Sequence, residues 1–535
     1  MFVPLALASC LVAPAPRPTL SGPELTYGSP DGRLLIHYTL QGGDALSVTD
    51  DTDPANGVPD QLDWVVEGIA RVHQAFVVED GWPAPISDEG AGGDDRLDVY
   101  IRNIDINGYA HTETTPLGNT AAWVELDPAN ARLLGKVVFE SIAGHEYHHV
   151  LQFRLYTGGG AWIYEASATY AQYLLFTEDL LVRLARDALW VIRLGNANAA
   201  LSAAGDPYEF EYAGMVWAKY LIERGGGDRK LLLYLWRAMG FYGDWVAGHD
   251  SFVKANLGMA DVDAAAADFA VWNWFACGND DGRHYSKDKL PCGVATNVPF
   301  ADVGTLPETG TSPTLGALGS AYVAVRPDCA SGALGVTVRP TRPTRFELVG
   351  VGAGAPATTV VDAPADADTV IPLDGWNRFA KVVLVGTNLG AGGGTFAWSA
   401  SASGVYATPD PLPPAKQVMV APATLALDEG ASATVAATAD FGTCEDGRDV
   451  TQVATWQSSD ERVAKASAGR VTAVGPGTTD VRAFLGQTGS NAVRVVVTSN
   501  EGCDLHHAAN GGGWAVILCI WLSIWMLARL VFRRN

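Results

Sequence analysis

Positive charge is scarce in this chain. Among its 535 residues, 36 are lysine or arginine and 59 are aspartate or glutamate, which gives a formal net charge of -23 at pH 7. Such a surface repels phosphate backbones and anionic lipids, so we expect no nucleic-acid partner. Charged residues amount to only 18% of the chain against 48% apolar residues, and this balance excludes wholesale disorder. The length, at about 150 residues per domain, excludes a single core and predicts a modular protein.

Cysteine is also rare. The chain has seven cysteines, and none of them lies at the spacing of a metal-ligand pair. Three fall in the terminal segments considered next: Cys10, Cys503 and Cys519. The other four suit an oxidising compartment, where two disulfides can form. Cys277 and Cys292 flank a short polar segment and make the natural local pair, which leaves Cys329 with Cys444 as the second pair.

The amino-terminal segment lacks basic residues before its apolar run. Residues 1–10 are apolar and end in small side chains, a composition that predicts export. The sequence Leu-Ala-Ser-Cys that ends at Cys10 resembles a bacterial lipoprotein processing box, which implies acylation of this cysteine. Ordinary signal cleavage nearby is the alternative. In both cases residues 1–20 are the predicted signal segment.

An apolar run near the carboxyl end extends from Trp514 to Ala528, and arginines follow it. This pattern predicts a transmembrane helix with basic groups on the cytoplasmic side. With a Gly-Cys pair ending at Cys503 and a three-glycine spacer, residues 500–535 resemble the MYXO-CTERM class of surface-sorting tails. The resemblance implies a sorting protease as a partner and a protein anchored at the cell surface or outer membrane, or released from it. A plain membrane anchor is the alternative.

Hydrophobic periodicity divides the chain into two halves of different kind. Apolar residues recur at helical spacing in six segments of the first half: 62–78, 136–156, 161–176, 178–194, 209–224 and 228–239. Two strands, 97–101 and 121–126, lie among them, so we expect an α+β domain over residues 21–300. Glycine and proline are concentrated in the second half, where short strands separated by turns predict a β-sandwich at 301–405.

A Pro-rich linker at 406–416 precedes another β-rich segment. Residues 417–499 contain an Ala-Thr-Trp-Gln-Ser-Ser-Asp stretch around Trp456 and a Gly-Arg-Val-Thr-Ala-Val-Gly-Pro-Gly-Thr stretch that ends at Thr478. These features resemble the group-2 bacterial immunoglobulin-like domain. The resemblance implies a second all-β sandwich of a type used as a spacer or for adhesion, and it does not distinguish between the two.

The motif that carries chemistry is His145-Glu146-Tyr147-His148-His149, which contains His-Glu-x-x-His. On a helix, residues four apart stand about 40° apart around the axis, so His145 and His149 can both reach one ion. Apolar residues of the same stripe place the pair on the face that packs inward. His148 lies off that face, and we expect it in a supporting or exposed position. An amphipathic helix whose histidines pair with neighbours is the alternative to a metal site.

Zinc is the ion that suits this pair. Zn²⁺ binds imidazole nitrogen at about 2.0–2.1 Å, and catalytic sites use three protein ligands so that the fourth position holds water. Glu146 directly follows a ligand in the sequence. We therefore predict that its carboxylate is the general base for that water and passes the proton to the leaving amine.

The predicted third ligand is Glu165, the next acidic side chain in a helical context after a three-glycine turn. Small residues beside it, including Ala166, Ser167 and Ala168, let the second helix approach closely. This pattern resembles the gluzincin type of zincin-like metallopeptidase, in which a downstream glutamate completes a site of two histidines and one glutamate. The spacing here is shorter than in thermolysin-like sites.

Two further elements follow from the same resemblance. Tyr212 begins a segment similar to the helix after the metal site in aminopeptidase-like gluzincins, which implies that its hydroxyl stabilises the oxyanion. A packing tyrosine is the alternative. Residues 123–126 are predicted as the edge strand that pairs with an extended substrate backbone.

A second metal is predicted in the acidic loop at residues 50–60. Asp51, Asp53, Asn56 and Asp60 offer oxygen ligands at spacings that resemble short calcium loops. An inserted Pro-Ala pair breaks the strict register of such loops. An Asx-rich turn that caps the following helix is the alternative to a Ca²⁺ site.

Over residues 25–300 the chain resembles a group of secreted bacterial metalloproteases. The sequence predicts a multidomain protein, with an α+β zincin-like metalloprotease domain followed by two all-β sandwich domains and a C-terminal transmembrane helix. We expect a zinc-dependent peptidase that cleaves proteins or peptides outside the cytoplasm. The alternatives are a non-catalytic surface adhesin that keeps the zincin fold and a zinc hydrolase that acts on a non-peptide amide.

Overall fold

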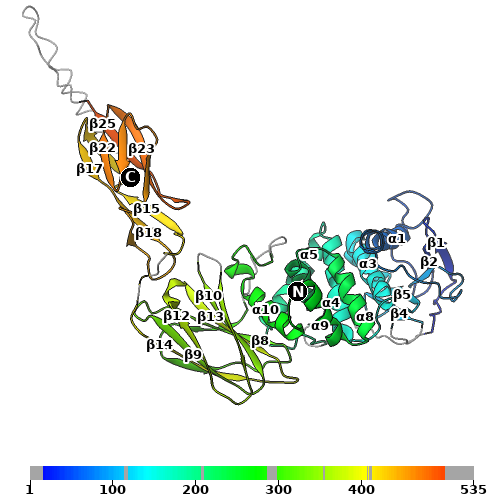
Figure 1. Ribbon diagram of the computed structural model, residues 1–535. Helices are drawn as coiled ribbons and strands as arrows, with labels where there is room; N and C mark the ends of the chain where they lie inside the picture. Colours follow the sequence, from blue (N-terminus) through cyan, green and yellow to red (C-terminus); the bar gives the residue numbers. More distant parts are fainter. Residues whose placement is uncertain are drawn as a thin grey trace, which may run out of the picture. The chain divides into compact units, whose positions relative to one another are not determined.

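The computed structural model describes residues 16–113, 118–205, 210–285, 298–352, 356–406, 408 and 412–499. These residues form two compact units (Figure 1). The first unit extends to Pro413 and includes Gly442–Cys444, and the second contains Pro414–Phe441 and the residues from Glu445 onward. The predicted sorting tail, from residue 500, and residues 1–15 of the predicted signal segment at 1–20 lie outside the described residues.

The first unit begins with a five-stranded sheet in the order β1-β2-β3-β5-β4. Its strands are β1 (Leu25–Gly28), β2 (Leu34–Tyr38), β3 (Leu97–Ile101), β4 (Gly108–Thr112) and β5 (Ala122–Leu126). The three central strands are parallel, and both edge strands are antiparallel to their neighbours. Ile36, Val99 and Val124 are fully buried in the core that this sheet shares with the helices, as the two-residue period of a strand allows.

Helices make up most of the rest of the α+β part, and their bounds follow: α1 (Asp60–Val72), α2 (Ala129–Leu134), α3 (Lys136–Phe153), α4 (Ala161–Leu175), α5 (Leu180–Gly195), α6 (Phe210–Ala213), α7 (Met215–Arg224), α8 (Lys230–Tyr242), α9 (Trp245–Asn256) and α10 (Val262–Trp274). A π-helix, His73–Glu79, continues α1. Helix α3 packs on α1, α4, β4 and β5. It therefore lies between the sheet and the remaining helices.

Two glycines permit the close helix crossings around α3. A methyl group at Gly68 of α1 would lie 2.2 Å from the carbonyl oxygen of Glu140, and one at Gly144 would lie 2.8 Å from Val72. Any larger residue at these positions would force the helices apart. The tight α1–α3 contact thus depends on glycine in both helices.

The helix predicted at 209–224 is divided in the structure. It ends as α6 at Ala213 and restarts as α7 at Met215, with Gly214 between them. A methyl group at Gly214 would lie 2.9 Å from the Cβ of Ala166 on α4. The break therefore lets this segment approach the helix that carries Glu165.

A β-sandwich completes the first unit. One sheet has the order β11-β10-β13-β8-β6 and the other β12-β9-β14-β7. The strands are β6 (Phe300–Val303), β7 (Glu308–Thr311), β8 (Ser320–Val325), β9 (Ala333–Pro340), β10 (Thr344–Val351), β11 (Ala357–Ala363), β12 (Thr369–Asp374), β13 (Lys381–Asn388) and β14 (Phe396–Ser403). Helix α10 packs on β10 and β13, and the Tyr322 hydroxyl donates a hydrogen bond of 2.9 Å to the carbonyl of Ala270. The core of the α+β part is thus continuous with the sandwich. The domain boundary predicted at residue 300 therefore falls within one packed unit.

The second unit consists of three small sheets, in the orders β15-β18-β19, β16-β25-β23-β20 and β17-β22-β21. The strands are β15 (Gln417–Ala421), β16 (Thr424–Asp428), β17 (Ser432–Thr434), β18 (Ala436–Asp440), β19 (Arg448–Asp449), β20 (Thr455–Ser458), β21 (Ala464–Ser467), β22 (Arg470–Ala473), β23 (Gly477–Leu485), β24 (Thr488–Gly489) and β25 (Val493–Thr498). Buried and exposed residues alternate along β23 and β25, which is typical of strands with one buried face.

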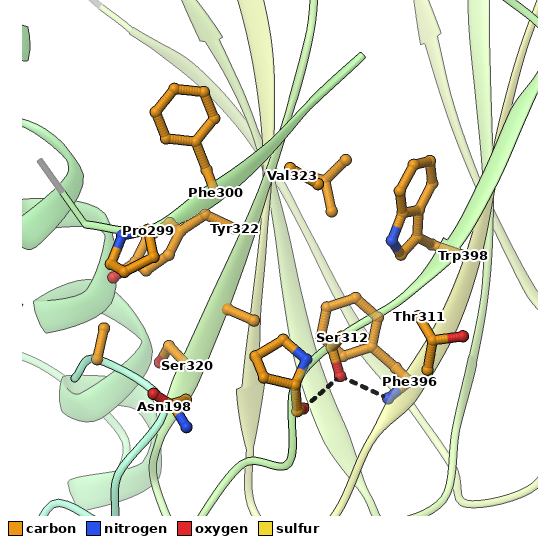
Figure 2. Close-up of a pocket in the computed structure, with 14 residues that line it drawn as sticks. Asn198, Pro299, Phe300, Thr311, Ser312, Ser320, Tyr322, Val323, Phe396 and Trp398 are labelled. Atoms are coloured by element: carbon orange, nitrogen blue, oxygen red, sulfur yellow. Dashed lines mark hydrogen bonds between the residues drawn. The ribbon is translucent and has the colours of Figure 1, made fainter. Parts of the chain in front are cut away.

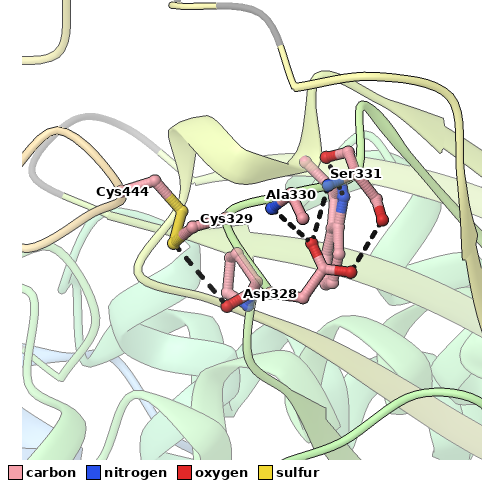
Figure 3. Close-up of a disulfide and its surroundings, with 7 residues drawn as sticks. Asp328, Cys329, Ala330, Ser331 and Cys444 are labelled. Carbon is pink, nitrogen blue, oxygen red and sulfur yellow. Dashed lines mark hydrogen bonds between the residues drawn. A yellow bond between two sulfur atoms is a disulfide. The ribbon is translucent and has the colours of Figure 1, made fainter.

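Cys329 and Cys444 form a disulfide, with their Cα atoms 5.3 Å apart (Figure 3). This confirms the pairing proposed for the two cysteines. Asp328 beside the bridge accepts hydrogen bonds from the backbone amides of Ala330 and Ser331. The other predicted pair involves Cys292, which lies outside the described residues.

None of the helices within the described ranges is both long enough and apolar enough to cross a membrane.

Candidate metal centre

Helix α3 carries the His-Glu-x-x-His motif through the middle of the first unit. Residues Val138 to Phe153 of this helix are all buried. His145 is 4% exposed and His149 is 1% exposed, on the face predicted by their four-residue spacing. The imidazoles are therefore held in a dry environment, where unpaired polar atoms are costly.

Helix α4 brings Glu165 to the same place. The glycine turn before it uses positive φ angles at Gly159 and Gly160, and the helix begins at Ala161. Ala166 and Ala168 are fully buried beside Glu165, which is itself 1% exposed. The short turn and the small side chains thus place the carboxylate against α3, as the sequence predicts.

Three donor atoms of these residues converge. Nε2 of His145 lies 3.1 Å from Nε2 of His149 and 3.1 Å from Oε2 of Glu165, and the remaining distance, from His149 Nε2 to Glu165 Oε2, is 3.5 Å. Donors of a tetrahedral zinc ion, each at about 2.0–2.1 Å from the metal, stand roughly 3.3–3.4 Å from one another. The three residues form a buried group that can hold a metal ion, and its spacing and chemistry fit zinc.

The electrostatics of this group depend on Glu165. Burial opposes the charged imidazole, but Glu165 and Glu146 raise the pKa of His149 to about 9. Burial also opposes the charged carboxylate, but His149 and His145 lower the pKa of Glu165 to about 2. A proton thus compensates the buried carboxylate here. A divalent cation at the same point would displace this proton, which is the usual coupling between metal binding and pKa.

Glu146 lies next to the edge of the sheet. Its side chain is 7% exposed, and burial raises its pKa to about 8. A methyl group at Gly108, the first residue of β4, would lie 2.8 Å from Oε1 of Glu146. Only glycine at this position lets the strand pass so close to the carboxylate. Gly108 is not among the residues predicted from the sequence, although a glycine within a strand often marks the close approach of another part of the chain.

The predicted edge strand is wrong. Residues 123–126 belong to β5, which pairs with both β3 and β4 and is therefore an interior strand. The edge strand next to β5 is β4, which lies antiparallel to β5 and packs on α3. The aromatic and β-branched residues of β5 reflect burial on both faces rather than an edge position.

Two other residues of the motif region also lie near the centre. The Tyr212 ring is 1% exposed, and its centroid is 6.1 Å from that of His145. His148 is fully buried instead of exposed, with its ring 4.6 Å from that of Phe76 and 5.0 Å from that of Trp82. Burial lowers the pKa of His148 well below its usual value, so this imidazole is neutral and acts as an aromatic packing residue.

Two carboxylates of the acidic loop before α1 accept hydrogen bonds from backbone amides of the same loop, while Asp53 pairs with Lys136 of α3 at 3.2 Å. Asp51 accepts hydrogen bonds from the amides of Asn56 and Gly57, each at 2.8 Å. Asp60 accepts hydrogen bonds from the amides of Thr52 and Asp53 and thereby caps the loop at the start of α1. This geometry is that of the Asx-rich turn, and the Ca²⁺ site at Asp51, Asp53, Asn56 and Asp60 stays a prediction.

A separate cavity of about 170 Å³ lies in the sandwich region of the first unit (Figure 2). Aromatic side chains such as Phe300, Tyr322 and Trp398 form much of its wall, with Asn198 and Ser320 among its polar residues. Its lining includes no imidazole or carboxylate. It therefore offers no acid–base group, unlike the metal centre.

Comparison with known proteins identifies one part of the chain. Residues 414–497 match the family model of the bacterial Ig-like domain (group 2). This confirms the Ig-like resemblance of the second unit. Together with the disulfide, it indicates an extracytoplasmic protein.

The other comparisons add no argument about the α+β part. No curated protein matches the chain. Among solved structures, the crystal structure of tripeptidyl peptidase 2 (TPP II) is similar over 26% of this chain and 12% of its own, with 9% sequence identity and a TM-score of 0.16. A likeness of this extent carries no argument, so the function is argued from the metal centre.

Proposed function

We propose that the protein is a zinc-dependent peptidase that hydrolyses peptide bonds outside the cytoplasm. The observation that carries this proposal is the convergence of His145 Nε2, His149 Nε2 and Glu165 Oε2 at the spacing of a zinc site. Two neutral imidazoles and one carboxylate are the ligand set of the gluzincin type. Glu146, next to this group in the helix, supplies an acid–base residue.

The residues of the chain have separable roles in this reaction. When bound, zinc supplies the Lewis acidity that makes hydrolysis feasible at neutral pH. The Glu146 carboxylate accepts a proton from the attacking water and delivers it to the nitrogen of the leaving amine. The Tyr212 ring is buried, with its centroid 6.1 Å from that of His145, and its hydroxyl is proposed as the neutral donor to the developing oxyanion.

Strand β4 is proposed to bind the substrate. It is the antiparallel edge of the sheet and passes beside Glu146 at Gly108. An extended peptide can pair with such an edge through main-chain hydrogen bonds, which places a peptide bond near the base without demanding particular side chains. This role replaces the one predicted for residues 123–126.

The protein is also proposed to be anchored at the cell surface. This part rests on the sequence alone, because the apolar run at 514–528 and the Gly-Cys pair at Cys503 lie outside the described residues. A sorting protease is the partner implied by the tail. Cell fractionation of the full chain and of a Cys503→Ala variant tests the proposal, which expects the variant to lose its surface attachment.

The peptidase proposal is tested with the purified full chain. We expect one zinc per chain and casein hydrolysis that falls by about 10²–10⁴-fold in Glu146→Gln, because the general base is lost while the ligands remain. Protein that takes up no zinc, or equal hydrolysis by both proteins, would overturn the proposal.

A surface-binding role is the second candidate, favoured by the Ig-like match at 414–497. Its discriminating test is cell-surface binding by the full chain and by Glu146→Gln. An adhesin keeps its binding in both and cleaves no peptide in either. A zinc hydrolase of non-peptide amides uses the same residues and is distinguished by the substrates that the wild type cleaves.

A further inference from the structure

Two buried glutamines flank the metal group between α3 and α4. Gln152 of α3 is fully buried, and Gln172 of α4 is 7% exposed. Neither side chain is a zinc ligand by type. Each one spans the two helices, Gln152 toward Tyr164 and Gln172 toward Ser141.

Gln152 holds His149 in one orientation. Its Oε1 lies 2.7 Å from Nδ1 of His149, while its Nε2 donates hydrogen bonds of 3.0 Å to the carbonyl of Tyr164 and 2.7 Å to the hydroxyl of Ser167. A carbonyl oxygen can only accept, so the amide must present its nitrogen to Tyr164 and its oxygen to His149. Nδ1 of His149 therefore carries a proton in both the charged and the neutral ring, so Nε2 is the nitrogen whose lone pair becomes available when a metal displaces the second proton.

The amide is itself held by a second layer. The Ser167 hydroxyl donates to the carbonyl of Ile163 at 3.1 Å and accepts a hydrogen bond from Nε1 of Trp236 at 3.1 Å. Trp236 is fully buried. The Ser167 hydroxyl thus accepts from both Trp236 and Gln152, and its own proton is used by Ile163. A rotated Gln152 amide would present its oxygen to a hydroxyl that has no proton left to donate.

Gln172 is oriented in the same way on the side of His145. The Ser141 hydroxyl donates to the carbonyl of Val138 at 2.7 Å and accepts from Nε2 of Gln172 at 3.0 Å. Because the hydroxyl proton is already used, Gln172 must present its nitrogen to Ser141 and keep its oxygen for another donor.

His145 has the matching unsatisfied atom. Its Nδ1 is buried and makes no hydrogen bond in the described part of the chain. The Gln172 amide contacts Ser141, which lies one helical turn before His145 on α3, so the amide lies beside the same face of the helix as this imidazole. A buried polar atom without a partner is costly, and a small rotation of the Gln172 amide would satisfy it.

We propose that Gln152 and Gln172 are paired positioning residues that hold His149 and His145 as their Nδ1–H tautomers, so that both Nε2 lone pairs converge with the Glu165 carboxylate. The inference rests on the proposed zinc site. Ligand histidines often donate to a carboxylate, which raises their basicity and adds negative charge. A neutral amide fixes the tautomer without that charge, so Glu165 is the only charged residue among the three proposed ligands.

The test measures zinc affinity of the full chain by competition with a chelator. We expect Gln152→Ala to bind zinc about 10–100-fold more weakly than the wild type, which is the usual effect of losing an outer partner of a ligand. Gln172→Ala is expected to weaken binding in the same direction. Gln152→Glu retains an acceptor for Nδ1 of His149, so it should bind zinc more tightly than Gln152→Ala.

Gln61 provides the matched control. It is fully buried, accepts from the amides of Ser47 and Val48 and donates to the carbonyl of Pro128, so it holds only backbone groups. Gln61→Ala should lose stability without a change in zinc affinity. Urea unfolding of each variant shows that it is folded, and Gln152→Met replaces Gln152→Ala if the latter is not.

The outcomes separate the two proposals. Zinc binding by the wild type with unchanged affinity in Gln152→Ala and Gln172→Ala would overturn the positioning role and leave the zinc site intact. Equal affinity of Gln152→Glu and Gln152→Ala would also overturn it, because the acceptor would then have no effect. Absence of zinc from the wild type would overturn the zinc site and, with it, this inference.

Discussion

The α+β part and the Ig-like domain bury different kinds of side chain. Along β25 of the Ig-like domain, buried valines alternate with exposed residues from Val493 to Thr498. Along α3, by contrast, every residue from Val138 to Phe153 is buried, and the set includes two histidine ligands and Glu146. Burial of polar groups costs free energy unless they are paired. The Ig-like domain thus buries only valines along this strand, while α3 retains buried polar groups that the proposed metal site accounts for.

The largest expected effect is at Glu165. Glu165→Ala removes a ligand and the partner that keeps His149 charged, so we expect zinc affinity to fall by more than the 10–100-fold caused by losing an outer partner. Chelator competition measures this loss. A variant that binds zinc like the wild type would show that the three buried side chains are an ordinary hydrogen-bonded cluster. The first unit would then not differ from the Ig-like domain by a metal site.

The next effect concerns the Ig-like domain. Trp456 is 8% exposed, and its Nε1 donates to the carbonyl of Thr451 at 3.0 Å. Trp456→Ala is expected to destabilise the second unit by about 3–5 kcal/mol, because it leaves a large cavity. Denaturant unfolding monitors that loss, and zinc content and casein hydrolysis should not change. A simultaneous loss of zinc would contradict the view that the metal centre of the first unit does not depend on the Ig-like domain.

A smaller effect is expected at Gly108. A side chain here would collide with Glu146, so Gly108→Ala should shift either the carboxylate or β4. Misplacement of a catalytic group by about 1 Å can reduce the rate by up to 10²-fold, and we expect a loss of about 10–100-fold in casein hydrolysis with zinc retained. Gly32→Ala is a useful control, because no atom lies within 4 Å of a methyl group at that position, although its φ of +74° adds backbone strain. Equal activity of both variants would show that β4 is not part of the active site.

The smallest effect concerns the pH dependence of stability. Burial and the neighbouring Glu67 raise the pKa of Glu140 to about 7 from its ordinary value of 4.5, against the opposing charges of Lys136 and Arg71. The folded protein binds this proton more tightly than the unfolded chain does. Its contribution to stability is therefore complete below pH about 4.5 and is lost as the pH rises through about 7.

Glu140→Gln removes that loss. Solvent partly screens the charges near Glu140, which reduces the effect. We expect the free energy of unfolding of the variant, relative to the wild type, to increase by about 1 kcal/mol between pH 4 and pH 8. Urea titrations at the two pH values give the difference. A constant difference between variant and wild type at both pH values would contradict the assignment to Glu140.

Much of the helical part could be predicted from the sequence, because long periodic segments carry a strong signal. The segment predicted at 136–156 is α3, and the one at 161–176 is α4. The motif spacing predicted that His145 and His149 share one face, and Glu165 was predicted as the next acidic side chain in a helical context. These predictions depend on spacing within short segments, and the folded protein keeps the helical geometry that this spacing implies.

The elements that were missed have weak local patterns. Strand β4 has only Ala110 in the core cluster, so its alternation is faint, and its role as the edge depends on how distant strands pair. Helix α10 is apolar all round because it packs on other helices and on β10 and β13, and so it lacks an amphipathic stripe. Gln172 of α4 contacts Ser141 of α3, near the metal group, only because the two helices cross. Such features arise from long-range packing, which no short segment encodes.

A crystal structure of the full chain grown with zinc, with anomalous scattering recorded at the zinc edge, is the sharpest test of the proposed metal centre. We expect one zinc ion about 2.0–2.2 Å from Nε2 of His145, Nε2 of His149 and the carboxylate of Glu165, with one coordination position open. A zinc ion bound through other residues, or these three side chains without any metal, would contradict it.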